Sequence, residues 1–316
     1  MRLSSMKAPR VGVFLTTPTH RTPEFEELKR MAAEAERLDY ESVWVSDHFY
    51  SFPTPGEDVF ESLTTLAALA PVTSRIRLGV MALCNSYRHP SLLAKTSATV
   101  DVVSRGRLEL GIGAGWYRAE YDAYGFPFPN ARVRTDQLSE AIRILKLLWT
   151  QDETTFHGKY FRVEQARDRP KPVQEPHPPI WVAGQGEKLT FGIVAESADY
   201  SNFYGLCPED CKMKNRVLDH MCKRLGRDPG TLVRSWAGNV IVAKNHDALT
   251  ERLRAFHATY YPLGEEIGTM IAGTPADCAS QIQDYLRAGI TYFIGYVFNP
   301  PGSESLKLFS DVVKSV

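Results

Sequence analysis

An acidic side chain and an imidazole stand next to each other at the end of an apolar segment of this 316-residue chain. The segment VWVSDHF, residues 43–49, places Asp47 directly before His48. Such a pair can hold, orient or move a proton, because histidine titrates near neutral pH and its ring nitrogens both donate and accept hydrogen bonds. Proton transfer is therefore the first candidate chemistry. The alternatives are that Asp47 caps a helix and that His48 is only packed or solvated.

Three further apolar segments also end in residues suited to holding a ligand. These are Cys84 and Asn85 after 76–83, the glycines of GIGAGW (111–116) after 107–113, and Gly184, Gln185 and Gly186 after 179–184. In VAGQGEKLT (182–190), the glycines precede a helical segment and leave backbone N–H groups free for an anion such as phosphate. The glycines of GIGAGW either let the backbone approach a flat ring or simply turn the chain.

The elements that position these residues alternate along the chain. Strands are expected at 10–15, 42–46, 76–83, 107–113, 179–184, 198–203, 231–243 and 291–298, and helices at 23–38, 60–70, 90–104, 134–149, 187–197, 208–226, 246–258 and 303–315. Strands that are apolar throughout indicate a parallel sheet covered by helices.

Eight β-then-α units predict an α/β fold of the (β/α)8 TIM-barrel type, with residues 1–316 as one domain. A doubly wound open sheet is the alternative, but its dinucleotide-binding form needs a glycine-rich turn after the first strand, and TTPTHRTP stands there instead. In a barrel the active site lies at the carboxyl ends of the strands. All of the candidate residues follow strands in this way.

Composition narrows the class of partner. The chain has 37 basic and 37 acidic residues, so no global charge favours nucleic acid or an anionic membrane. Its apolar runs fall short of the roughly 20 residues that cross a bilayer, and MRLSSMKAPR does not read as a signal peptide. We therefore expect a cytoplasmic protein acting on a small molecule. Cys207 and Cys211 form a CxxxC without a matching histidine pair, so no metal site is expected.

Several segments, in the same order, resemble the bacterial luciferase-like superfamily, and specifically its flavin- and deazaflavin (coenzyme F420)-dependent oxidoreductases. The segments are SVWVSDHF (42–49), LGVMALCNSYRHP and its continuation to FPFP (78–129), PPIWVAGQGEKLTFGIVAESADYSNFYG (178–205) and IAGTPADCASQIQDYLRAGITYFIGYV (271–297). This resemblance implies a TIM barrel with insertion loops at the carboxyl ends of the strands. It also implies a flavin-type ring bound there, usually a homodimer, and hydride transfer or oxygenation.

The resemblance also implies roles for Asp47, His48 and the third strand. His48 matches the imidazole that faces the reactive edge of the deazaflavin, and Asp47 would hold the cofactor's polar edge or orient His48. The third strand is where the family often has a non-proline cis peptide behind the central ring. The corresponding bond here joins Met81 and Ala82.

Other residues are matched to the remaining parts of the cofactor. Cys84 and Asn85 match positions that contact the pyrimidine portion of the ring. Gly113 is assigned to the same cofactor site. Gly184, Gln185 and Gly186 match the phosphate loop, with Gln185 in place of the more usual glycine. Trp116 and Glu120, which follow GAG, correspond more loosely to family positions.

The implied function is hydride transfer between F420 and a small organic substrate, with His48 managing the proton or the developing charge. Two alternatives remain open: an FMN-dependent monooxygenase that uses molecular oxygen, and a non-catalytic flavin-binding protein. An alcohol, a sugar phosphate, an enone and an imine are all open as substrates, because the loops that select the substrate vary most.

Overall fold

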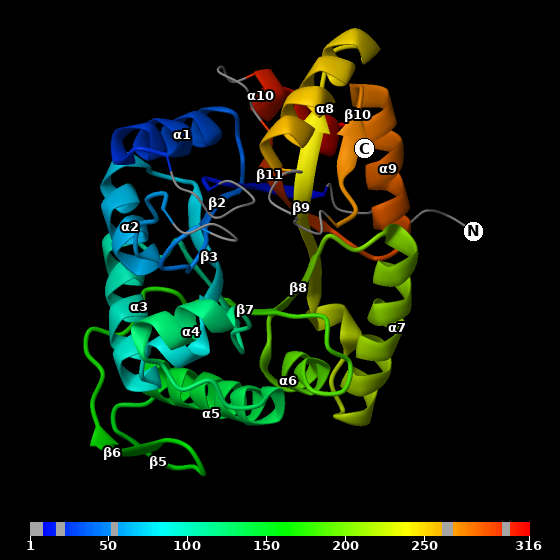
Figure 1. Ribbon diagram of the computed structural model, residues 1–316. Coiled ribbons are helices and arrows are strands. Elements are labelled where there is room, and N and C mark those ends of the chain that lie inside the picture. Colours follow the sequence, from blue (N-terminus) through cyan, green and yellow to red (C-terminus); the bar gives the residue numbers. More distant parts are fainter. Residues whose placement is uncertain (1–8, 17–22, 52–55, 261–267, 299–303) are drawn as a thin grey trace.

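Eight parallel strands form the closed barrel of this protein. The computed structural model describes residues 9–16, 23–51, 56–260, 268–298 and 304–316 (Figure 1). The barrel strands are β1 (Arg10–Phe14), β2 (Ser42–Val45), β3 (Arg77–Cys84), β4 (Leu108–Gly113), β7 (Ile180–Ala183), β8 (Tyr200–Tyr204), β9 (Val233–Val242) and β11 (Tyr292–Val297). A parallel pairing of β8 with β9 closes the ring, which confirms the predicted barrel and excludes the open sheet.

Helices form an outer layer around the strands (Figure 1). They are α1 (Phe25–Arg37), α2 (Ser62–Leu69), α3 (Pro90–Ser104), α5 (Ala131–Thr150), α6 (Thr190–Ser197), α7 (Pro208–Arg224), α8 (His246–Tyr260), α9 (Pro275–Arg287) and α10 (Glu304–Lys314). In α1 the buried residues are Leu28, Ala32 and Ala35, spaced so that they share one helical face. Among the helices of the described ranges, none is long and apolar enough to cross a membrane.

The structure contains elements that the sequence pattern did not predict. They are the antiparallel hairpin β5 (Thr154–His157) and β6 (Arg162–Ala166), the short helix α4 (Arg118–Tyr124), strand β10 (Ile271–Gly273) beside β9, helix α9, and the 3-10 turns η1 (Ala70–Val72), η2 (Asn85–Tyr87) and η3 (Pro229–Thr231). The hairpin is largely exposed and polar, and β10 has only three residues, so neither forms an apolar run long enough to stand out.

Aromatic side chains fill the barrel interior. Trp44 and Trp181 are fully buried, with ring centroids 4.7 Å apart, and Tyr292 lies 5.0 Å from Trp181. Gly79 makes room for this cluster, since a Cβ there would lie 2.3 Å from the Trp44 ring. Deeper in the barrel, the Trp181 Nε1 donates to Glu109, which also pairs with Arg77. The interior is therefore a packed core, and any large ligand must bind at an end of the barrel.

Strand β3 departs from regular pairing just before the candidate residues Cys84 and Asn85. Its register with β4 shifts between Val80 and Leu83. On β4, Gly111 faces this irregularity, and a Cβ at that position would lie 2.1 Å from the Val80 carbonyl oxygen. A backbone oxygen cannot swing aside as a flexible side chain can. Glycine is therefore required at position 111 for β4 to approach β3 this closely.

We predict that Gly111→Ala lowers the free energy of unfolding by about 2 kcal/mol or more, because the added methyl overlaps backbone in a packed sheet. Gly192→Ala is the matched control. Gly192 lies exposed on α6 with no atom within 4 Å of an added Cβ, so alanine there should be neutral or stabilise by up to about 1 kcal/mol. Chemical denaturation of both variants measures the difference. Equal stability of the two would contradict the close approach of β4 to β3.

Candidate active site

The carboxyl ends of β2, β3 and β4 bring most of the sequence-predicted residues together. These strands are neighbours in the barrel, so the segments that leave them lie side by side. The Cys84 backbone N–H donates to Asp47 at 2.9 Å, and the His48 Nδ1 lies 3.0 Å from Glu120 on α4. The peptide bond between Met81 and Ala82, the candidate that the family resemblance indicated, is cis. Gly113 follows on β4, where a Cβ would lie 3.4 Å from the Ala183 carbonyl oxygen at the end of β7.

Asp47 is buried and its carboxylate is saturated by protein donors. Arg88 binds it through both terminal nitrogens, at 2.7 and 2.8 Å. Ser62 on α2 donates to Oδ1 at 2.6 Å, and the Cys84 N–H donates to Oδ2. Four donors occupy the roughly four acceptor positions of a carboxylate. Arg88 also pairs with Glu61, and these two acids raise the pKa of its guanidinium despite burial, so Arg88 stays charged.

This arrangement differs from the expectation that Asp47 orients His48. The carboxylate that contacts the His48 Nδ1 is Glu120, 72 residues further along the chain. Asp47 instead fixes the ends of β2 and β3 relative to each other and to α2, and His48 is placed by following it in the chain. The oxygens of Asp47 are thus committed to protein donors.

Glu120 is fully buried and surrounded by donors. It accepts from the Phe49 N–H at 2.8 Å and from the Tyr87 hydroxyl at 2.6 Å, besides its contact with His48. The pKa of Tyr87 is raised mainly by burial and further by its hydrogen bond to Glu120. The phenol therefore stays protonated and acts as the hydrogen-bond donor. The contact with Glu120 fixes the orientation of the His48 ring through Nδ1.

The Cys84 thiol is buried in this site and held in its protonated form. Its thiol is buried, and this burial raises its pKa to about 11, opposed by a hydrogen bond with the Tyr121 hydroxyl at 3.0 Å. A thiol with that pKa is protonated at neutral pH and therefore unreactive. The residue contributes its backbone N–H to Asp47 and its side chain to the packing against α4.

The loop after β7 has the features of an anion site. Gly184 has a φ of +144°, and a Cβ there would lie 2.9 Å from the Thr190 side chain. The Gly186 carbonyl accepts from the N–H groups of Thr190 and Phe191, which starts the turn into α6. Lys214 reaches this loop from α7, where it donates to the Gln185 carbonyl at 3.1 Å and pairs with Glu187. A positive charge and a helix start therefore meet at Gly184–Gly186.

Five buried polar atoms at the carboxyl ends of the strands have no hydrogen-bond partner. They are Thr16 Oγ1 after β1, Ser46 Oγ after β2, Asn85 Oδ1 and Ser86 Oγ after β3, and Gln185 Oε1 after β7. An unpaired buried polar atom costs about 1–3 kcal/mol, so five of them at one end of a barrel point to a polar ligand that pairs with them. Asn85 and Gln185 were identified as candidate ligand-binding residues from their positions after predicted strands. No feature of the sequence distinguished Thr16 and Ser46 as candidates.

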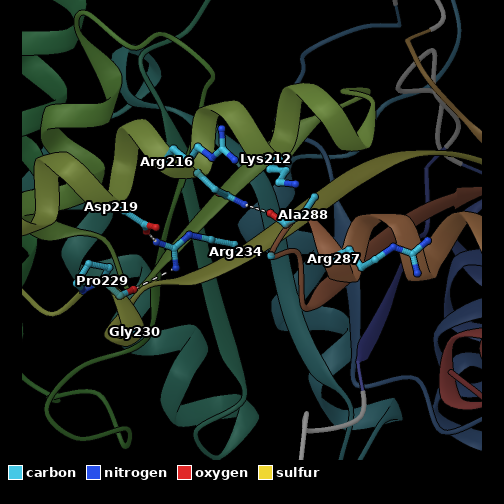
Figure 2. A pocket seen from close by; sticks show the side chains of 10 residues that line it. Lys212, Arg216, Asp219, Pro229, Gly230, Arg234, Arg287 and Ala288 are labelled. Carbon is cyan, nitrogen blue, oxygen red and sulfur yellow. Dashed lines mark hydrogen bonds and ion pairs between the residues drawn. The ribbon is translucent and has the colours of Figure 1, made fainter. Parts of the chain in front are cut away.

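A distinct hollow lies at the opposite end of the barrel (Figure 2). Its volume is about 410 Å³, and residues from α7, η3, the start of β9 and the turn before β11 line it. Its Arg234 is held by Asp219 and by the Pro229 carbonyl at 3.1 Å, and Asn215 donates to the Ala288 carbonyl. These contacts join α7 to the amino-terminal ends of the strands. The hollow is therefore remote from His48 and belongs to the end of the barrel associated with stability.

Comparison with known proteins gives consistent matches over most of the chain. The model of the luciferase-like monooxygenase family matches residues 1–266. An F420-dependent glucose-6-phosphate dehydrogenase of Kineococcus radiotolerans is 28% identical over 308 residues, covering 90% of this chain and 89% of the relative. An FMNH2-dependent dimethylsulfone monooxygenase of Pseudomonas putida is 33% identical over 156 residues, covering 49% of this chain and 42% of the relative.

Solved structures share the fold. An F420-dependent secondary alcohol dehydrogenase, solved with an F420-acetone adduct, superimposes with a TM-score of 0.83 at 22% identity. The alignment covers 97% of this chain and 98% of that one. At this level of identity, the likeness establishes the barrel alone.

We predict that Asp47→Ala lowers the free energy of unfolding by about 3–5 kcal/mol, because it leaves Arg88 and the Cys84 N–H without their buried acceptor. Asp122→Ala is the control. Asp122 pairs with Arg118 on the exposed face of α4, and its loss should cost less than about 0.5 kcal/mol. Denaturant titrations of both variants measure the two costs. A small effect at Asp47, similar to that at Asp122, would contradict its role as the anchor of the site.

Proposed function

The chain belongs to the luciferase-like monooxygenase family, and from this membership we propose that it is an F420-dependent oxidoreductase that transfers a hydride between the deazaflavin and a small organic substrate. The observation that carries the proposal is the His48–Glu120 pair at the carboxyl ends of the strands. Relatives named as F420-dependent dehydrogenases align over about nine-tenths of the chain, which supports F420 as the cofactor.

The residues at the carboxyl ends fit a flavin-type cofactor. Such a molecule combines a flat ring of several polar edge atoms with a phosphate on a flexible chain. The unpaired atoms of Thr16, Ser46 and Asn85 offer partners for the polar edge, and the loop Gly184–Gly186 beside Lys214 offers a place for the phosphate. We assign Met81, Ala82, Cys84 and Gly113 to the walls around the ring, since they line adjoining strand ends.

The protein's part in the reaction is to position groups and to manage a proton. The deazaflavin, when bound, supplies the carbon that accepts or donates the hydride. Oxidation of an alcohol also releases a proton from the substrate oxygen. His48 is placed to take that proton on Nε2, because Glu120 holds Nδ1 and stabilises the imidazolium that forms. In the reverse direction the same ring returns the proton to the carbonyl oxygen.

An FMN-dependent monooxygenase is the second candidate function, and the similarity to the dimethylsulfone monooxygenase supports it. Two assays on the purified protein separate the candidates. The oxidoreductase proposal requires anaerobic oxidation or reduction of F420 with an alcohol or ketone, followed by absorbance. The monooxygenase requires oxygen uptake with reduced FMN. Oxygen uptake without any F420 turnover would overturn the proposal, and tight binding of a flavin without turnover in either assay would indicate a non-catalytic binding protein.

We further propose that the protein is a homodimer, as the family resemblance implies. Leu92, Val102 and Val103 are exposed on α3, and Val72 is exposed on η1, which packs against α3. Exposed apolar side chains at both ends of one helix and on the turn beside it are consistent with a surface that pairs with another chain. Light scattering should therefore give twice the 35.5 kDa mass of one chain. A mass of one chain at micromolar concentration would contradict the dimer.

We predict that His48→Ala lowers turnover with F420 by about 100-fold or more, while stability and F420 affinity change little, because a positioned base contributes a factor of this size. His157→Ala is the control, because His157 pairs with Glu164 on the exposed hairpin of β5 and β6, outside the candidate site. Steady-state kinetics together with a fluorescence titration of F420 measure both effects. Turnover that is unchanged in His48→Ala would remove the imidazole from the mechanism.

A further inference from the structure

A group of exposed and partly buried aromatic rings lies beside His48. We call Tyr50, Trp116, Tyr117 and Tyr124 the aromatic ledge. The Trp116 and Tyr117 rings are 5.2 Å apart, Tyr50 lies 6.0 Å from Tyr117, and Tyr124 lies 6.3 Å from Tyr50. The His48 ring meets both Trp116 and Tyr117 edge-on at 6.0 Å. The ledge thus begins at the imidazole and extends away from it.

The ledge combines large exposed apolar area with a fixed position. Trp116 is 60% exposed and Tyr124 is 53% exposed. Behind them, Phe49 stacks on Tyr124 at 4.3 Å, and its N–H is held by the buried Glu120. Glu120 therefore holds both His48 and the backbone of Phe49, against which Tyr124 packs. Clustered exposed aromatics of this kind indicate a ligand surface, because each ring can bury about 150–250 Å² on contact.

The basic side chains around the ledge are already engaged. Arg88 is bound by Asp47 and Glu61, and Arg118 is paired with Asp122. Arg134 donates to the carbonyls of Gly115 and Pro129 and lies over the Phe128 ring. Arg88 and Arg118 are therefore neutralised by acids, whereas Arg134 is held by neutral groups. The buried Glu120 carboxylate beside His48 disfavours a phosphate or carboxylate at the imidazole.

We propose that the aromatic ledge binds the substrate, and that the substrate is an uncharged alcohol or ketone with an aromatic or alicyclic body. This inference rests on the proposed function, because it takes His48 as the group that meets the substrate oxygen. Under this inference, the substrate of this chain belongs to a different class from that of its relatives named for glucose 6-phosphate. The apolar body lies against Trp116 and Tyr117 while its oxygen faces His48.

Ligand binding tests the inference without relying on turnover. Saturation-transfer NMR and calorimetry are carried out on the F420-loaded protein with acetophenone and, separately, with glucose 6-phosphate. Acetophenone should bind saturably, Trp116→Ala should weaken that binding by about tenfold, and Trp116→Phe should retain most of it. Leu225→Ala, which removes an exposed apolar side chain at the end of α7, is the control and should have no effect.

The outcomes separate this inference from the function on which it rests. Tighter binding of glucose 6-phosphate than of acetophenone, or equal acetophenone affinity in wild type and Trp116→Ala, overturns the ledge as the substrate surface. Absence of acetophenone binding overturns it as well. F420 affinity, titrated in the same preparations, reports on the proposed function independently. Failure to bind F420 would overturn the proposed function, whereas intact F420 binding with any of the contrary ligand results would overturn the ledge alone.

Discussion

The buried carboxylate of Asp47 is the constraint on which the candidate site depends. A buried charge is tolerated only when it is paired and fully hydrogen-bonded, so Asp47 fixes the positions of Arg88, Ser62 and the Cys84 backbone around it. These contacts hold the ends of β2 and β3 together at the point where the chain continues into His48. Glu120 then plays a second and similar part, holding His48 and the Phe49 backbone from α4.

Much of this architecture is readable in the sequence, and the remainder depends on long-range contacts. All eight barrel strands are predicted, most of them because a strand buried on both faces is rich in apolar residues. Position after such a run also identifies His48, Asn85 and the Gly184–Gly186 loop. The partnership of His48 with Glu120 spans 72 residues and leaves no local pattern. The hairpin of β5 and β6 was missed for a different reason, since its exposed residues carry no apolar signal.

The two ends of the barrel use charge in different ways. At the amino-terminal end, Arg234 and Asp219 join helix α7 to β9, and the resulting contacts stabilise the fold. At the carboxyl-terminal end, the carboxylates of Asp47 and Glu120 accept hydrogen bonds from the donors around them. Polar atoms of Thr16, Ser46, Asn85 and Gln185 have no partner there. Relatives with this barrel include both F420-dependent dehydrogenases and an FMNH2-dependent monooxygenase, so the fold does not determine the chemistry.

Hydrogen–deuterium exchange with and without F420 tests most directly whether the carboxyl ends of β2, β3 and β7 form the F420 site. We expect F420 to slow amide exchange in residues 45–50, 84–88 and 184–190. Exchange should not change in residues 212–219 and 229–234, which line the hollow at the opposite end. Slowed exchange confined to that hollow, with none at the carboxyl ends of the strands, would exclude an F420 site there.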